Sequence, residues 1–275
     1  MGQLADVGRD EGRLEPVLEL DDTVPQWITI VGRKGSGKSY LARAFFDSYN
    51  GDRLLIDPNG DVDLSDLDDD EHVEKLSKPF PDRWPEPFDL DELGHPRRRR
   101  RSTLRYVPDP RSPTFIEDMD AVVGLAMVKG DCMLWIDEGG MLTRGSYTPP
   151  NTRWLLHQGR HHRVSFMPCQ PRSIDINPLY LAQADYVAVF DLPHHRDRER
   201  IAANIGYPPQ DFEAVHAEIW RPAPGDKGKW TGFAWWESVP QLMTVMPPLP
   251  PRQRARAART GQRFDQHDDQ LVEME

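Results

Sequence analysis

The sequence predicts an α/β fold with a mainly parallel sheet that helices cover on both faces, and three observations support this prediction. Short, continuously apolar runs, typical of strands buried on both faces, recur along the chain. Segments with helical spacing of apolar residues alternate with them. A glycine-rich loop joins the first run to the first such segment. This alternation implies right-handed crossovers and places ligands at the carboxyl ends of the strands.

The elements follow from these patterns in order. The expected strands are residues 27–31, 53–56, 104–107, 132–136, 164–167 and 186–190. The expected helices are residues 39–46, 114–128, 151–162, 178–183 and 196–205. A small C-terminal β-hairpin is expected from residues 218–220 and 230–236, where aromatic residues are dense and favour packing over a base-stacking platform.

Composition predicts one main domain, because 275 residues with 38% hydrophobic content can bury one substantial core. We expect an N-terminal extension over 1–25, a main domain over 26–240 with an insertion at 61–102 that interrupts regular structure, and a flexible Pro/Arg-rich tail over 241–275. The formal net charge of −11 is concentrated in residues 61–92, which hold 13 acidic residues and three basic ones. The remainder is nearly neutral, so the net charge does not argue against a nucleic-acid partner.

Two cysteines are too few for a disulfide scaffold, and their expected places at opposite ends of neighbouring strands argue against a bond between them. No apolar run reaches the roughly 18 residues of a membrane span, and residues 1–22 are acidic and polar, unlike a signal peptide. We therefore expect a cytoplasmic protein without a membrane span.

Residues 32–39 fit G-x-x-x-x-G-K-[ST], the loop that wraps the phosphates of a nucleoside triphosphate. The glycines permit backbone conformations that turn N–H groups inward, and the following helix directs its positive end at the same phosphates. Lys38 is placed to hold the β- and γ-phosphates, and the Ser39 hydroxyl to bind Mg²⁺. The expected nucleotide-binding residues are Gly32, Arg33, Lys34, Gly35, Ser36, Gly37, Lys38, Ser39 and Tyr40.

Asp137 and Glu138 follow an apolar strand and supply the other half of a hydrolytic site. Asp137 at the strand's tip is expected to hold Mg²⁺, and Glu138 to orient the attacking water. The adjacent acids, together with the absence of an Asn-Lys-x-Asp segment, favour an ATPase over a GTPase. The alternative is an exposed pair of acids at a strand end.

Gln170 ends another apolar strand, and its amide could sense the γ-phosphate or hold the water if that strand is central. The alternative is a turn-capping role before Pro171. Arg160 is the first candidate, and Arg163 the second, for an arginine that reaches a neighbouring subunit's ATP. For each, a solvated helix face is an equally plausible interpretation, and Arg144 and Arg153 are further candidates.

These motifs together resemble the FtsK/HerA superfamily of ATP-driven DNA pumps, and within it the genome-packaging ATPases of membrane-containing icosahedral viruses. The resemblance covers about residues 27–206. It rests on the phosphate loop, Ile56-Asp57-Pro58, the 137–138 pair, the Arg-His to Gln-Pro segment 160–171, and the segment 184–206. It implies a RecA-like (ASCE) P-loop NTPase core that uses ATP and Mg²⁺.

The resemblance also implies a homo-oligomeric ring, often a hexamer, that moves double-stranded DNA through its centre. We expect no membrane anchor and no DNA-reading terminal domain of the kind the cellular pumps have. This expectation argues against chromosome segregation and favours a compact viral or mobile-element motor, in the host cytoplasm or the virion, with capsid or vertex proteins as possible partners. Residues 97–101 and Arg144 are candidate phosphate contacts on DNA. Two alternatives stay open: a nucleotide or small-molecule kinase, and an ATP-binding assembly or switch protein.

Overall fold

The computed structural model describes residues 24–65, 67, 72–85, 88–90, 96–98, 101–143, 147–173, 176–225 and 230–249. Its main feature is a nine-stranded sheet in the order β11-β10-β9-β1-β8-β7-β2-β6-β3. The seven strands from β9 to β3 run parallel, while β10 is antiparallel to both of its neighbours. The predicted fold class, a mainly parallel α/β sheet, is confirmed.

The strands of the main sheet are β1 (Ile28–Val31), β2 (Asp52–Ile56), β3 (His72–Leu76), β6 (Ser102–Tyr106), β7 (Cys132–Ile136), β8 (Val164–Gln170), β9 (Tyr186–Val189), β10 (Phe233–Glu237) and β11 (Leu242–Met246). The helices are α1 (Lys38–Ser48), α2 (Phe115–Lys129), α3 (Pro150–Gln158), α4 (Pro178–Ala182), α5 (His195–Ile205) and α6 (Pro209–Glu218), with a 3-10 turn at Gly139–Met141. A separate two-stranded ribbon pairs β4 (Phe88–Leu90) with β5 (Pro96–Arg98).

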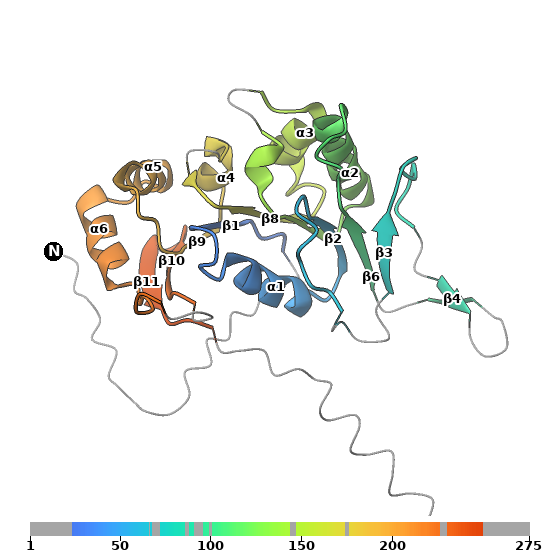
Figure 1. Ribbon diagram of the computed structural model, residues 1–275. Helices are drawn as coiled ribbons and strands as arrows, with labels where there is room; N and C mark the ends of the chain where they lie inside the picture. The colour runs from blue at the N-terminus through green and yellow to red at the C-terminus, as the bar shows by residue number, and fades with distance from the viewer. Residues whose placement is uncertain are drawn as a thin grey trace, which may run out of the picture.

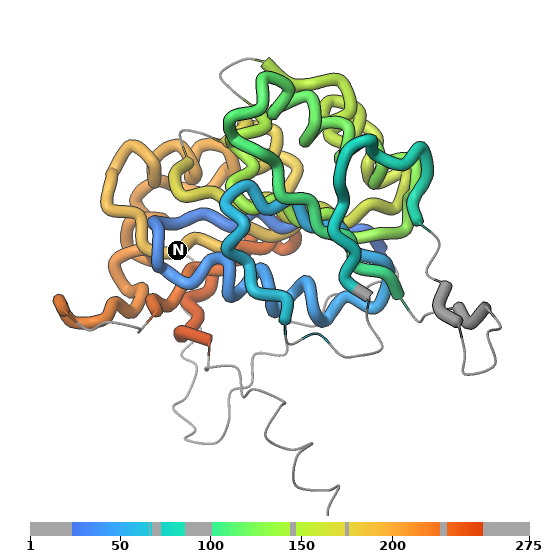
Figure 2. The backbone as a smooth tube through the Cα atoms, turned by 45° about the vertical axis from the view of Figure 1, so that its right-hand side comes forward, coloured from blue at the N-terminus to red at the C-terminus, as the bar shows by residue number. Residues whose placement is uncertain are grey.

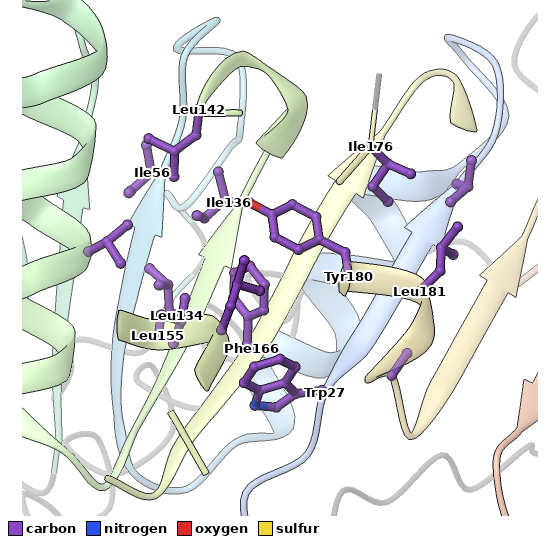
Figure 3. Close-up of a cluster of buried hydrophobic side chains, with 14 of the residues drawn as sticks. Trp27, Ile56, Leu134, Ile136, Leu142, Leu155, Phe166, Ile176, Tyr180 and Leu181 are labelled. Carbon is purple, nitrogen blue, oxygen red and sulfur yellow. The ribbon is translucent and has the colours of Figure 1, made fainter. Parts of the chain in front are cut away.

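Helices cover both faces of the sheet: α1 lies on one face, and α2, α3 and α4 lie on the other (Figure 1 and Figure 2). The strands supply alternate residues to two buried clusters, because successive side chains of a strand point to opposite faces. In β7, Met133 and Trp135 pack in the cluster under α1, whereas Leu134 and Ile136 pack in the cluster on the opposite face. Figure 3 shows part of this second cluster, in which Trp27, Phe166 and Tyr180 lie in a row. Continuous apolar runs in the sequence therefore mark strands that are buried on both sides.

The C-terminal hairpin differs from the predicted one. Residues 233–237 pair with residues 242–246. The expected partner, residues 218–220, is not a strand, because residue 218 is the last residue of helix α6 and residues 219–220 follow it. The backbone N–H of Gly232 does donate to the carbonyl of Trp220 at 3.0 Å, so the two segments still touch once. The sheet thereby extends past residue 240, because β11 lies within the segment assigned to the tail.

The insertion at 61–102 also holds more regular structure than expected. Strand β3 pairs in parallel with β6 and forms the edge of the main sheet. Most of the expected tail, residues 250–275, lies outside the described residues, as does most of the N-terminal extension. Both cysteines are buried free thiols, as predicted. Within the described part of the chain, no helix has the length and apolar character needed to cross a bilayer.

Candidate functional site

The phosphate loop lies where the sequence predicts, between β1 and the N-terminus of α1. Gly35 and Gly37 adopt φ angles of 76° and 105°, in the left-handed region that favours glycine. Gly37 also caps α1, whose first turn leaves backbone N–H groups free for an anion. The Ser36 hydroxyl is buried without a hydrogen-bond partner among the described residues. The loop thus has the backbone geometry and the spare donors of a phosphate cradle.

Three neighbouring segments hold this loop in place. The Gly32 N–H donates to the carbonyl of Gln170, and the Arg33 N–H donates to the carbonyl of Asp191, both at 3.1 Å. The Arg33 guanidinium also pairs with the Asp191 carboxylate at 2.9 Å. From the C-terminal side, the Thr231 hydroxyl donates to the carbonyl of Ser36 at 3.1 Å. The conformation of the loop is therefore fixed by contacts with the rest of the fold.

Lys38 lies across the mouth of the loop, where its Nζ donates to the carbonyl of Arg33 at 3.1 Å. Burial lowers the pKa of its ammonium below the usual value, while the Asp137 and Glu138 carboxylates oppose that shift. A cation that is partly desolvated and already aimed at the loop gains strongly from a phosphate, because electrostatic interactions strengthen in a poorly solvated site.

Asp137 extends β7 at its carboxyl end and faces the first turn of α1. The Ser39 hydroxyl donates to its Oδ1 at 3.4 Å. Burial raises the pKa of the Asp137 carboxyl to about 6, and the nearby Asp57 and Asp61 carboxylates add to that shift. The hydroxyl and the carboxylate meet as predicted, and they form the oxygen-donor pair expected for a hard cation.

Sequence reasoning missed two further acids beside this pair. One oxygen from each of the Asp57, Asp61 and Asp137 carboxylates lies within 4.8 Å of the others. Asp57 is fully buried, pairs with Arg105 at 2.5 Å, and accepts the backbone N–H groups of Gly60 and Val62, the residues on either side of Asp61. The sequence does contain a signal for Asp57, because this residue directly follows a buried strand and the carboxyl ends of parallel strands meet at one edge of a sheet. In the structure this strand, β2, pairs with β7.

Glu138 stands at a sharp change of chain direction. Its φ of 59° and ψ of 48° are left-handed, which is unusual for a residue other than glycine and costs of order 1–2 kcal/mol. This conformation turns the chain from β7 into the 3-10 turn at 139–141 and leaves the Glu138 side chain lining the cleft beside Lys38. Strain of this kind persists where the surrounding structure enforces it, and it often marks a functional position.

Gln170 ends β8, which lies between β1 and β7 as the prediction required. The residue is 1% exposed, and its side-chain Nε2 has no hydrogen-bond partner among the described residues. A buried amide without a partner is costly, which points to a group that the site is built to receive. The cleft between these strand tips has a volume of about 160 Å³. Its lining consists of Lys34, Gly35, Lys38, Ser39, Asn59, Asp61, Asp137, Glu138, Cys169, Gln170 and Pro171.

The two predicted arginine fingers lie away from this cleft, near the amino ends of the strands. Arg160 forms a two-point ion pair with Asp185 at 3.0 and 3.1 Å, and its guanidinium lies over the Trp27 ring. Arg163 pairs with Asp131, just before β7. Neither arginine meets the phosphate loop of its own chain, and a role toward a neighbouring subunit stays a prediction.

The other basic candidates are only partly described. Arg153 donates to the carbonyl of Thr148 at 3.3 Å, and Arg144 lies outside the described residues. In the run 97–101, the Arg101 side chain donates to the carbonyl of Tyr49 at 2.8 Å. Residues 99–100 lie outside the described residues, so the expectation of DNA contacts by this run stays a prediction.

Comparison with known proteins identifies structural relatives but no sequence relatives. No family model matches the chain, and no curated protein matches it. The genome packaging NTPase B204 from Sulfolobus turreted icosahedral virus 2, in complex with AMP, is similar with a TM-score of 0.57 and 18% identity, over 84% of this chain and 100% of that chain. Its complex with ATP-gammaS gives a TM-score of 0.56 and 19% identity over the same shares of the two chains.

The DNA-packaging ATPase B204 from Sulfolobus turreted icosahedral virus gives a TM-score of 0.54 and 20% identity, over 82% of this chain and 99% of that chain. At these identities the likeness shows the fold alone. The chain has the α/β P-loop fold of these packaging NTPases.

Proposed function

We propose that this protein is an ATP-hydrolysing motor that translocates double-stranded DNA, with the packaging of a viral genome into a capsid as its task. The observation that carries the hydrolytic part is the convergence of Lys38, Glu138 and Gln170 on one small cleft, from three different elements. The structural relatives support the same reading, because they are packaging NTPases and some of them hold ATP analogues.

The roles follow from the positions of the side chains. Lys38 and the loop N–H groups hold the phosphates. Glu138 accepts a proton from a water molecule as that water attacks the γ-phosphorus and the bond between this phosphorus and the β–γ bridging oxygen breaks. The γ-phosphoryl group and the water become inorganic phosphate, and ADP, the leaving group, keeps the bridging oxygen and stays bound through its phosphates. The unpaired amide of Gln170 donates to a γ-phosphate oxygen and so distinguishes ATP from ADP.

The oxygen donors at the cleft fit a magnesium ion. Ser39 and Asp137 offer a hydroxyl and a carboxylate 3.4 Å apart, and Asp61 adds a second carboxylate beside them. Hard oxygen ligands of this kind, with room for water, are what Mg²⁺ takes in nucleotide sites. When bound, the ion would neutralise charge that develops on the β- and γ-phosphates.

The DNA part of the proposal rests on resemblance and on charge distribution. Most of the formal negative charge lies in residues 61–92, so the remaining surface can accept a polyanion. A motor that moves DNA of any sequence needs phosphate contacts without base reading. A ring of identical subunits would bring Arg160 or Arg163 of one subunit toward the ATP of the next.

The decisive experiment measures ATP hydrolysis by the purified protein with and without duplex DNA, beside the Glu138→Gln variant. We expect DNA to stimulate hydrolysis, and Glu138→Gln to bind Mg-ATP within about threefold of the unmodified protein while hydrolysis falls about 100-fold or more. Glu117→Gln is the matched control, because Glu117 is exposed on α2 outside the cleft. Unimpaired hydrolysis by Glu138→Gln would refute the assigned role of Glu138.

The same assay tests the two alternatives. Stimulation by a small phosphate acceptor, with none by DNA, would favour a kinase. Binding without appreciable hydrolysis under any condition would favour an assembly or switch protein.

A further inference from the structure

The side of the phosphate loop that faces away from the catalytic acids carries two aromatic rings. Tyr40 follows Ser39 on the first turn of α1, and Trp230 precedes β10. Their ring centroids are 4.0 Å apart with an interplanar angle of 38°. Both residues are partly exposed.

Trp230 is held against the loop itself. The nearest side-chain atom to a Cβ built on Gly37 is the Trp230 Cβ at 3.3 Å, so glycine leaves just enough space for the tryptophan. The next residue, Thr231, is buried and donates its hydroxyl to the carbonyl of Ser36. The segment at 230–231 is therefore attached to the loop at two adjacent points, and the position of the indole follows that of the loop.

The direction of a bound triphosphate follows from the catalytic side chains. Asp137, Glu138 and Gln170 end β7 and β8, so the γ-phosphate lies on that side of the loop. The α-phosphate must then lie at the opposite end of the phosphate chain, near the start of α1. The nucleoside of a bound triphosphate would then extend from the loop on the side of Tyr40 and of the strands β9 and β10.

We propose that Trp230, together with Tyr40, forms an aromatic wall on which the base of the nucleotide stacks. This inference rests on the proposed function, because it assigns the base subsite of the same ATP site. Stacking on an indole uses the π-face that every base has, and it strengthens binding without reading hydrogen-bonding groups on the base edge. The wall also explains why a C-terminal segment is fastened to the phosphate loop.

The test compares two probes that differ only in the nucleoside: Mg-ATP and inorganic tripolyphosphate with Mg²⁺. For Trp230→Ala in the full chain, we expect the affinity for Mg-ATP, measured by calorimetry, to fall about 5- to 100-fold. Affinity for tripolyphosphate should stay within about twofold, and Trp230→Phe should recover most of the Mg-ATP affinity. Trp220→Ala is the matched control, because Trp220 is 43% exposed and its hydrogen bond with Gly232 uses only the backbone.

Each outcome decides the matter. An unchanged Mg-ATP affinity in Trp230→Ala overturns the wall, and so does an equal loss for both probes, which would make Trp230 a support for the loop only. Should Trp230→Ala fail to fold, Tyr40→Leu gives the same comparison, since it removes the other ring and keeps an apolar side chain on α1. If the unmodified protein binds neither probe, the proposed function fails, and that result is distinct from a failure of the wall.

Discussion

Replacing Gly35 with alanine separates the backbone strain of the phosphate loop from its function. Gly35 has a φ of 76°, and a Cβ built on it meets no atom within 4 Å. The substitution therefore adds strain without a clash. Gly206, at the C-terminus of α5, offers the same situation away from the loop, with a φ of 69° and equally open space.

The stability effect should be the same at both sites. An L-residue in the left-handed region costs about 1–2 kcal/mol relative to glycine, so each variant should lose about that much free energy of unfolding. Denaturant titration followed by circular dichroism measures this loss.

Nucleotide binding should differ between the two variants. The strain at residue 35 favours loop conformations in which one peptide group is turned, and binding must then either restore the strained conformation or lose one backbone hydrogen bond to a charged phosphate, which costs about 1.5–3 kcal/mol. Calorimetry with Mg-ATP should thus show affinity about 10- to 100-fold weaker for Gly35→Ala and unchanged for Gly206→Ala. Equal weakening in both variants, or none in Gly35→Ala, would refute the claim that glycine is needed there to aim the loop's N–H groups.

Two further predictions concern stability. His216 accepts the Leu192 N–H, and burial together with the nearby Arg221 lowers the pKa of its imidazole to about 4. In the unfolded chain the imidazole of His216 is protonated below about pH 6.5, so its contribution to the free energy of unfolding is fully present above that pH and falls by at most about 3 kcal/mol toward pH 4. His216→Gln should remove this part of the decline in denaturation measured against pH. An unaltered profile would contradict the assignment. Arg105→Met should lower the free energy of unfolding by about 3–5 kcal/mol, because it leaves the buried Asp57 carboxylate without its ion-pair partner. Adding Asp57→Asn should recover part of that loss. Additive losses in a double-mutant cycle would show that the two side chains are not coupled.

The central strands could be predicted from the sequence because they are buried on both faces. Residues 132–136 are apolar without interruption, and the structure places them as β7 in the middle of the sheet. Helix α2 was predicted at 114–128 and observed at Phe115–Lys129, since its apolar spacing is regular. A strand buried on both faces must be apolar at nearly every position, and such a continuous apolar run can be recognised in the sequence.

The edges of the sheet were harder to predict for the same physical reason. Strand β3 reads His-Val-Glu-Lys-Leu and pairs on one side only, so its charged residues carry no strand signal. Helix α6 was not assigned from the sequence, although it begins at Pro209, and proline at the first helical position is a known start signal. Strand β11 follows β10 after only residues 238–241, so this hairpin is a short-range pattern that was missed because residues from 241 onward were assigned to the tail.

The phosphate loop is held in part by the C-terminal segment, a contact that the sequence did not indicate. Hydrogen bonds from the ends of β8 and β9 and from the segment before β10 fix the loop on three sides, so its N–H groups need little reorganisation when phosphate binds. The remaining side opens to Glu138 and Gln170, where the chemistry would take place. Thr231 and Trp230, directly before β10, contact Ser36 and Gly37 of the loop, so the C-terminal segment takes part in holding the loop in this conformation.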